Sequence, residues 1–82
     1  MNETQNQSEV AQLRKQLEQE YEAMLRGMHG LAAGTARHNF IRERMDNVSN
    51  YQARLAKVVG DVDAALIVGS AYYKIANEQL ES

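Results

Sequence analysis

The sequence predicts an all-α protein, a helical hairpin or three-helix bundle with coiled-coil-like packing that is completed by oligomerisation. Proline and tryptophan are absent, and apolar residues recur every three or four positions along most of the chain, as on one face of a helix. At 82 residues and without cysteine, the chain has no disulfide to support its core. Regular helix packing or self-association must therefore stabilise it.

The clearest periodic segment predicts a helix over residues 9–29. Ser8 stands just before it and is a suitable N-cap, since its hydroxyl can accept a hydrogen bond from free amides of the first turn. Residues 1–7 are polar, so we expect a flexible N-terminal segment followed by a single helical domain over residues 8–82. The apolar positions of this helix fall within a narrow stripe: Val10, Leu13, Leu17, Tyr21, Met24, Met28 and Leu31.

Three glycines follow within a short stretch, and they have two interpretations. In the first, Gly30 or Gly34 closes the helix, the chain turns, and Thr35 caps the next helix. In the second, Gly27, Gly30 and Gly34 form a smooth helix face that lets two helices approach closely. The turn is the preferred interpretation, because glycine is unfavourable inside a helix.

The second half of the chain predicts one or two helices over residues 36–80. Its seven-residue pattern continues across Gly60, although Gly60 followed by Asp61 looks locally like a helix end and a new N-cap. Gln52 interrupts the apolar seam, either as a buried polar residue that fixes register or at a wet edge. The seam contains these residues: Ile41, Met45, Val48, Leu55, Val59, Val62, Leu66, Gly69, Tyr73, Ala76 and Leu80.

The last helix is apolar on two sides, and this is the strongest indication of a partner. Val62, Leu66, Tyr73 and Leu80 belong to the seam, which we expect to face the core. A second face lies about 100° away, and we expect it to bind a partner. From that face we assign Val68, Tyr72 and Ile75 to the partner-binding surface.

A basic and aromatic cluster on the middle segment is the second candidate surface. Residues 31–60 are net basic, whereas the segments on both sides are net acidic. Such a face can bind a protein or the phosphates and bases of nucleic acid, or its arginines can simply pair with acidic residues of the first helix. We assign these residues to it: Arg37, Phe40, Arg44, Tyr51 and Arg54.

The motifs of common enzymes are missing from the sequence. His29 and His38 have no metal-ligand spacing, the serines lack the glycine context of a nucleophile elbow, and the glycines match no phosphate-binding loop. We therefore expect no catalytic residues, no cofactor and no metal. No apolar stretch reaches the roughly 20 residues that span a bilayer, and the first residues do not resemble a signal peptide.

Together these observations favour a cytoplasmic, non-enzymatic helical interaction or assembly module, either a homo-oligomer or a subunit of a larger complex. Its expected partners are a copy of itself or another protein, with no membrane partner. The alternative is a small nucleic-acid-associated or regulatory protein that uses the basic face. The formal net charge of −2 gives this alternative no general support.

Overall fold

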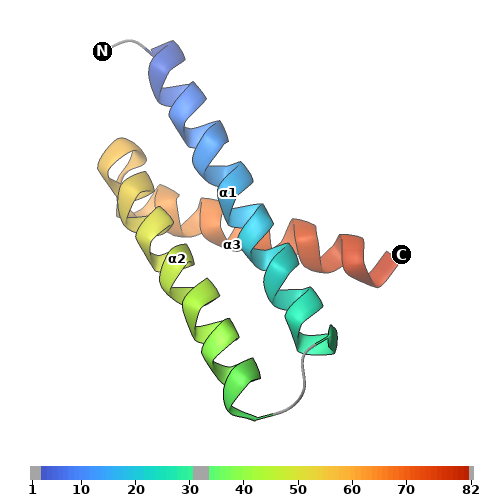
Figure 1. The fold of residues 1–82 in the computed structure, drawn as a ribbon. Helices are drawn as coiled ribbons and strands as arrows, with labels where there is room; N and C mark the ends of the chain where they lie inside the picture. Colours follow the sequence, from blue (N-terminus) through green and yellow to red (C-terminus); the bar gives the residue numbers. More distant parts are fainter. Residues whose placement is uncertain (1–2, 31–33, 82) are drawn as a thin grey trace.

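The computed structural model describes residues 3–30 and 34–81, and these form three helices without a strand (Figure 1). Helix α1 spans Glu3–Gly30, α2 spans Thr35–Val59 and α3 spans Asp61–Glu81. The all-helical prediction is confirmed, and of the two architectures for the second half the one that breaks at Gly60 is correct. Helix α1 begins at Glu3, so Ser8 lies within the helix and is not its N-cap.

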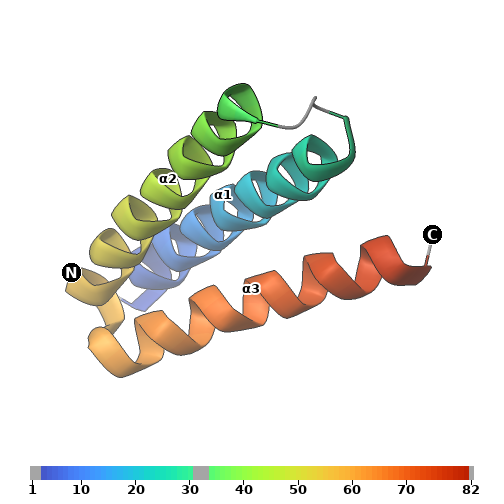
Figure 2. The ribbon, with the colours of Figure 1, turned by 90° about the horizontal axis from the view of Figure 1, so that it is seen from below.

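The three helices form two layers (Figures 1 and 2). Helices α1 and α2 lie side by side and antiparallel, and α3 crosses both of them in a second layer. Each pair of helices is in contact, so the arrangement is a three-helix bundle with overall extents of 46 × 27 × 18 Å. One side of α3 faces away from the other two helices along its length (Figure 2).

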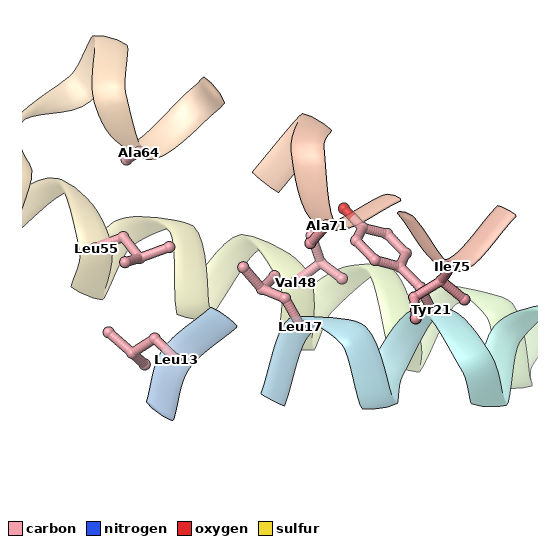
Figure 3. Packing of buried hydrophobic residues seen from close by; sticks show 8 residues of the cluster. All are labelled: Leu13, Leu17, Tyr21, Val48, Leu55, Ala64, Ala71 and Ile75. Atoms are coloured by element: carbon pink, nitrogen blue, oxygen red, sulfur yellow. The ribbon is translucent and has the colours of Figure 1, made fainter. Parts of the chain in front are cut away.

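The core lies where the three helices meet (Figure 3). Leu13, Leu17 and Tyr21 contribute from α1, which confirms the centre of the stripe predicted for the first helix. Helix α2 contributes Val48 and Leu55, both from its predicted seam. Helix α3 contributes Ala64, Ala71 and Ile75.

Two glycines with positive φ mark the ends of α2. Gly34 precedes the helix with φ 108°, and Gly60 follows it with φ 90°, a region that residues with a Cβ rarely adopt. The amide of Gly60 still donates to the carbonyl of Ala56, and its carbonyl accepts from the amide of Ala64. The chain therefore changes direction at one residue, and the sequence pattern that continues across Gly60 does not continue as one helix face.

The first glycine of the predicted turn has a different role. Gly27 is buried inside α1, and a Cβ built on it would lie 2.8 Å from Cε1 of Phe40 in α2. Here the close-approach interpretation is correct, whereas Gly34 belongs to the turn. Thr35 is the first residue of α2 and Gly34 its N-cap, so the expected threonine cap is wrong.

Among the helices in the described part of the chain, none is both long and apolar enough to cross a membrane.

Candidate interaction surface

Polar contacts with α1 fix the rotation of α3 about its own axis. Arg14 donates a 2.9 Å hydrogen bond to Ser70, and the Lys74 ammonium lies 3.1 Å from a Glu18 carboxylate oxygen. The Tyr21 hydroxyl donates to the backbone carbonyl of Val68 at 3.4 Å. These contacts come from successive turns of α1, and they hold one face of α3 against α1 over the middle turns of α3.

The structure corrects the expected orientation of the two apolar faces of α3. Ile75, assigned to a partner surface, is 1% exposed in the core, and Val68 packs against the core. Tyr72 is about half exposed and makes an edge-to-face contact with Tyr21, with 5.4 Å between ring centroids. The face expected to bind a partner is therefore largely the inner face.

The reason for this reversal is steric. Ala64 and Ala71 are fully buried, and such short side chains allow the α3 backbone to lie close to the α1 and α2 layer. A face carrying Leu66 and Tyr73 would hold α3 farther away. Periodicity identifies both apolar faces but does not rank them, whereas the size of their side chains does.

The opposite face of α3 carries four of the six exposed large hydrophobic side chains found among the described residues. We call it the outer stripe, and it consists of Val62, Leu66, Gly69, Tyr73, Ala76 and Leu80. Its large side chains are mostly exposed: 74% for Val62, 64% for Leu66, 70% for Tyr73 and 83% for Leu80. Exposed patches of this size and continuity on soluble proteins commonly mark interaction sites.

The outer stripe has the spacing of a helix-pairing surface. Its residues alternate steps of four and three, the pattern that keeps one seam of a helix facing a neighbouring helix. A Cβ at Gly69 would meet nothing within 4 Å, so there is open space at the middle of the stripe. Beside its C-terminal end, a groove of about 330 Å³ is lined by Leu25, Tyr72, Ala76, Gln79 and Leu80.

The borders of the outer stripe carry little charge. Asp63, Ser70 and Asn77 follow one edge, while Ala65, Tyr72 and Gln79 follow the other. Asp63 is the one charged residue of these six, and the nearby Lys74 is already paired with Glu18. Arg14 of α1 adds a cation to the first edge through its hydrogen bond to Ser70. An approaching helix therefore meets an apolar centre and one neutral edge, which lowers the desolvation cost of contact on that side.

Arg44, the centre of the predicted basic face, contributes to the contact between α1 and α2. Its guanidinium lies 3.5 Å from a Glu20 carboxylate oxygen and 5.2 Å from the centre of the Phe40 ring. Asn47 donates to the same carboxylate at 3.0 Å. This agrees with the alternative in which the arginines pair with acidic residues of the first helix.

The other members of the basic face differ in their burial. Tyr51 packs against the core, and Arg54 is exposed. Arg37 is half-buried and already has an interaction partner. Gln52 in the seam of α2 is half-buried. Its exposure lies between the buried position and the wet edge that the sequence suggests.

Tyr21 is a buried titratable residue that joins two helices. Burial raises the pKa of its phenol above 10.0, and the neighbouring Tyr72 raises it further. The side chain joins α1 to α3 through its ring contact and its hydrogen bond to Val68. These features give it a structural role in the bundle.

Within the described residues, histidines and carboxylates form no group suited to holding a metal ion. His38 instead lies beside Arg42, with 3.0 Å between its Nε2 and Nη2 of the guanidinium. The His29 side chain lies outside the described residues. Comparisons with family models, with curated proteins and with solved structures find no match for this chain.

Proposed function

We propose that this protein is a non-enzymatic assembly module that forms homo-oligomers by burying the outer stripe of α3. The single observation that carries the proposal is the stripe itself, a continuous apolar helix face that the chain leaves in water. Burying one large apolar side chain is worth about 1.5 to 3 kcal/mol. Four such side chains on one face are a substantial driving force for association, compared with the marginal stability of a small domain.

The engagement of the basic face supports this proposal over nucleic-acid binding. Arg44 is tied to Glu20 and covers Phe40, so a phosphate would compete with contacts that hold α1 to α2. The absence of cysteine suits a reducing compartment, and we therefore place the assembly in the cytoplasm.

Sedimentation equilibrium over low to high micromolar concentration tests the proposal. We expect the average mass of the wild-type protein to rise with concentration, and we expect Leu66→Glu to keep the protein monomeric while circular dichroism stays helical. Ser49→Glu adds the same charge at an exposed position of α2 and is the matched control. A wild-type mass that stays at one chain throughout, or association unaffected by Leu66→Glu, would refute the proposal.

Nucleic-acid binding is tested in the same preparation. Titration with a labelled duplex at low and moderate salt should show no affinity that falls steeply with salt. Strong salt-dependent binding that is lost in Arg54→Glu but kept in Leu66→Glu would favour the basic face as the functional surface.

A further inference from the structure

We infer that the partner of the outer stripe is the same stripe of a second copy, docked antiparallel so that Tyr73 of each chain fills the space above Gly69 of the other. This inference rests on the proposed function and specifies its geometry. Three observations carry it: the order of large and small residues along the stripe, the open space at Gly69, and the charges at the edges.

Residue sizes along the stripe favour the antiparallel orientation. When two copies run in opposite directions about a two-fold axis near position 71, Gly69 faces Tyr73, Leu66 faces Ala76 and Val62 faces Leu80. The first two layers then combine a large side chain with a small one, and the third combines two of moderate size. Because no layer contains two tyrosines or two glycines, the two helix axes can stay close together along the stripe.

A parallel pair lacks this complementarity. Each residue would then face its own copy, so two Tyr73 side chains would share one layer and two Gly69 residues another. The helices would be forced apart at the tyrosines and leave an empty space at the glycines. Empty space next to overfilled space is unfavourable in a packed interface.

The edges of the stripe agree with the antiparallel orientation. Asp63 of one chain would lie beside Asn77 of the other, and the two Ser70 residues would lie near the axis. The Asp63 carboxylate at each end of the interface therefore faces an amide that can donate to it.

The area of the stripe suits a small dimer interface. Its four large side chains are mostly exposed, so pairing two stripes removes eight such side chains from water. Specific interfaces bury at least about 1,000 Å² in total, and this dimer belongs at the small end of that class. The groove beside Leu80 extends this surface, because in the same register Val62 of the partner chain reaches its edge. Helix α3 lies on one side of the α1 and α2 pair (Figure 2), so this pairing would place the α1 and α2 layers of the two chains on opposite sides of the dimer.

Gly69→Leu is the decisive variant, because the two orientations predict opposite results. In the antiparallel dimer the new side chain occupies the space of Tyr73 from the other chain, and we expect the dimer dissociation constant to rise about tenfold or more. In a parallel dimer two leucines would fill an empty layer and the dissociation constant would fall. The folded monomer should tolerate the change, since a Cβ there meets nothing within 4 Å and leucine favours helix over glycine.

Cross-linking of single-cysteine variants gives an independent readout, because the chain has no cysteine of its own. Ser70→Cys and Asp63→Cys lie one heptad apart on the same edge, and both native residues are exposed. Ser70→Cys also removes the hydrogen bond from Arg14, so its circular dichroism and mass in solution are compared with those of the wild type before cross-linking. In the antiparallel dimer a short bis-maleimide should join two chains at position 70 but not at position 63, where the two copies lie more than about 20 Å apart. A parallel dimer would cross-link equally at both positions.

The outcomes separate the inference from the proposed function. A wild-type dimer that Gly69→Leu weakens and that cross-links only at position 70 supports both. A dimer that Gly69→Leu strengthens, or that cross-links equally at both positions or at neither, overturns the antiparallel geometry and leaves self-association standing. A wild-type protein that is monomeric at every concentration overturns both. If Gly69→Leu loses its helical circular dichroism, Gly69→Ala repeats the measurement with a smaller expected change of the same sign.

Discussion

Replacing Gly27 with alanine should destabilise the protein, although alanine favours helix over glycine. The substitution adds one methyl group in the last turn of α1, where the propensity difference alone would stabilise the fold by up to about 1 kcal/mol. The new Cβ would lie 2.8, 3.0 and 3.4 Å from three carbons of the Phe40 ring, so the ring or the helix has to move. Carbon–carbon contacts below 3.0 Å are repulsive. Because the Phe40 ring belongs to α2, this repulsion acts between α1 and α2.

The magnitude follows from what holds Phe40 in place. The Arg44 guanidinium covers the ring at 5.2 Å and is itself bound to Glu20, so a shift of the ring disturbs that contact as well. Overfilling a packed site typically costs about 1 to 3 kcal/mol, which exceeds the propensity gain. We therefore expect Gly27→Ala to lower the free energy of unfolding by about 1 kcal/mol, which corresponds to about 4 to 8 °C in Tm for a domain of this size.

A double-mutant cycle separates the two contributions. In a Phe40→Ala background the clash is gone, so Gly27→Ala should raise the free energy of unfolding by up to about 1 kcal/mol instead of lowering it. The measurement is urea denaturation followed by circular dichroism at one low micromolar concentration. Equal effects of Gly27→Ala in both backgrounds, within about 0.5 kcal/mol, would refute the close approach of Gly27 and Phe40.

Three further perturbations have clear expected results. Leu17→Ala should lower the free energy of unfolding by about 2 to 5 kcal/mol because Leu17 is fully buried, whereas Leu66→Ala, measured on the monomer, should change it by less than about 0.5 kcal/mol. Because burial and then Tyr72 raise the pKa of Tyr21, the folded state holds the phenol proton more tightly than the unfolded state. The stability that this proton contributes is complete below about pH 10 and is lost as the pH rises through the raised folded pKa. The Tm of Tyr21→Phe should therefore fall less than the Tm of the wild type between about pH 9 and 11. An equal fall in both proteins would contradict the raised pKa of Tyr21. Gly60→Ala should lower stability by about 1 to 2 kcal/mol, measured by urea denaturation, because φ at this position is 90°; an unchanged midpoint would contradict the turn.

The sequence predicts most of the fold because helix periodicity records which side of each helix is buried. The stripe of α1 is read correctly at Leu13, Leu17 and Tyr21, and the seam of α2 is read correctly at Val48 and Leu55. The ends of helices are harder to predict from the sequence. Ser8 is chemically suited to an N-cap, yet the polar residues before it continue the helix to Glu3.

Glycine roles are the part of the fold that a local pattern leaves open. Gly27 and Gly34 each fit a turn or a close approach by composition alone, and Gly60 fits either a helix end or a continuous helix. The structure places Gly27 against Phe40 and gives Gly34 and Gly60 positive φ. The difference depends on residues distant in the sequence, in the first case on an aromatic ring of the next helix.

The sequence also leaves open which apolar face of α3 is exposed. The sequence correctly indicates that α3 has two apolar faces and that one of them remains exposed, but the assignment of Val68, Tyr72 and Ile75 to the exposed face is wrong for most of that face. The error came from extending the seam of α2 through Gly60. The positive φ at that residue turns the chain, so the phase of the pattern in α2 says nothing about the phase in α3.

The placement of small residues inside α3 links stability to assembly. Because Ala64 and Ala71 occupy the inner face, Ile75 is the one large side chain that α3 buries fully. The polar contacts of α3 with Arg14 and Glu18 lie at or near the surface. Exposed ion pairs contribute little, so α3 is held to the other helices by less apolar burial than its composition would allow. Under the proposed function, the larger share of that apolar surface is buried only between chains. A ligand that binds only the folded state stabilises that state, and a second copy of the chain acts as such a ligand. The attachment of α3 to the other helices should therefore strengthen as the protein concentration rises. The contact between α1 and α2 should depend less on the protein concentration.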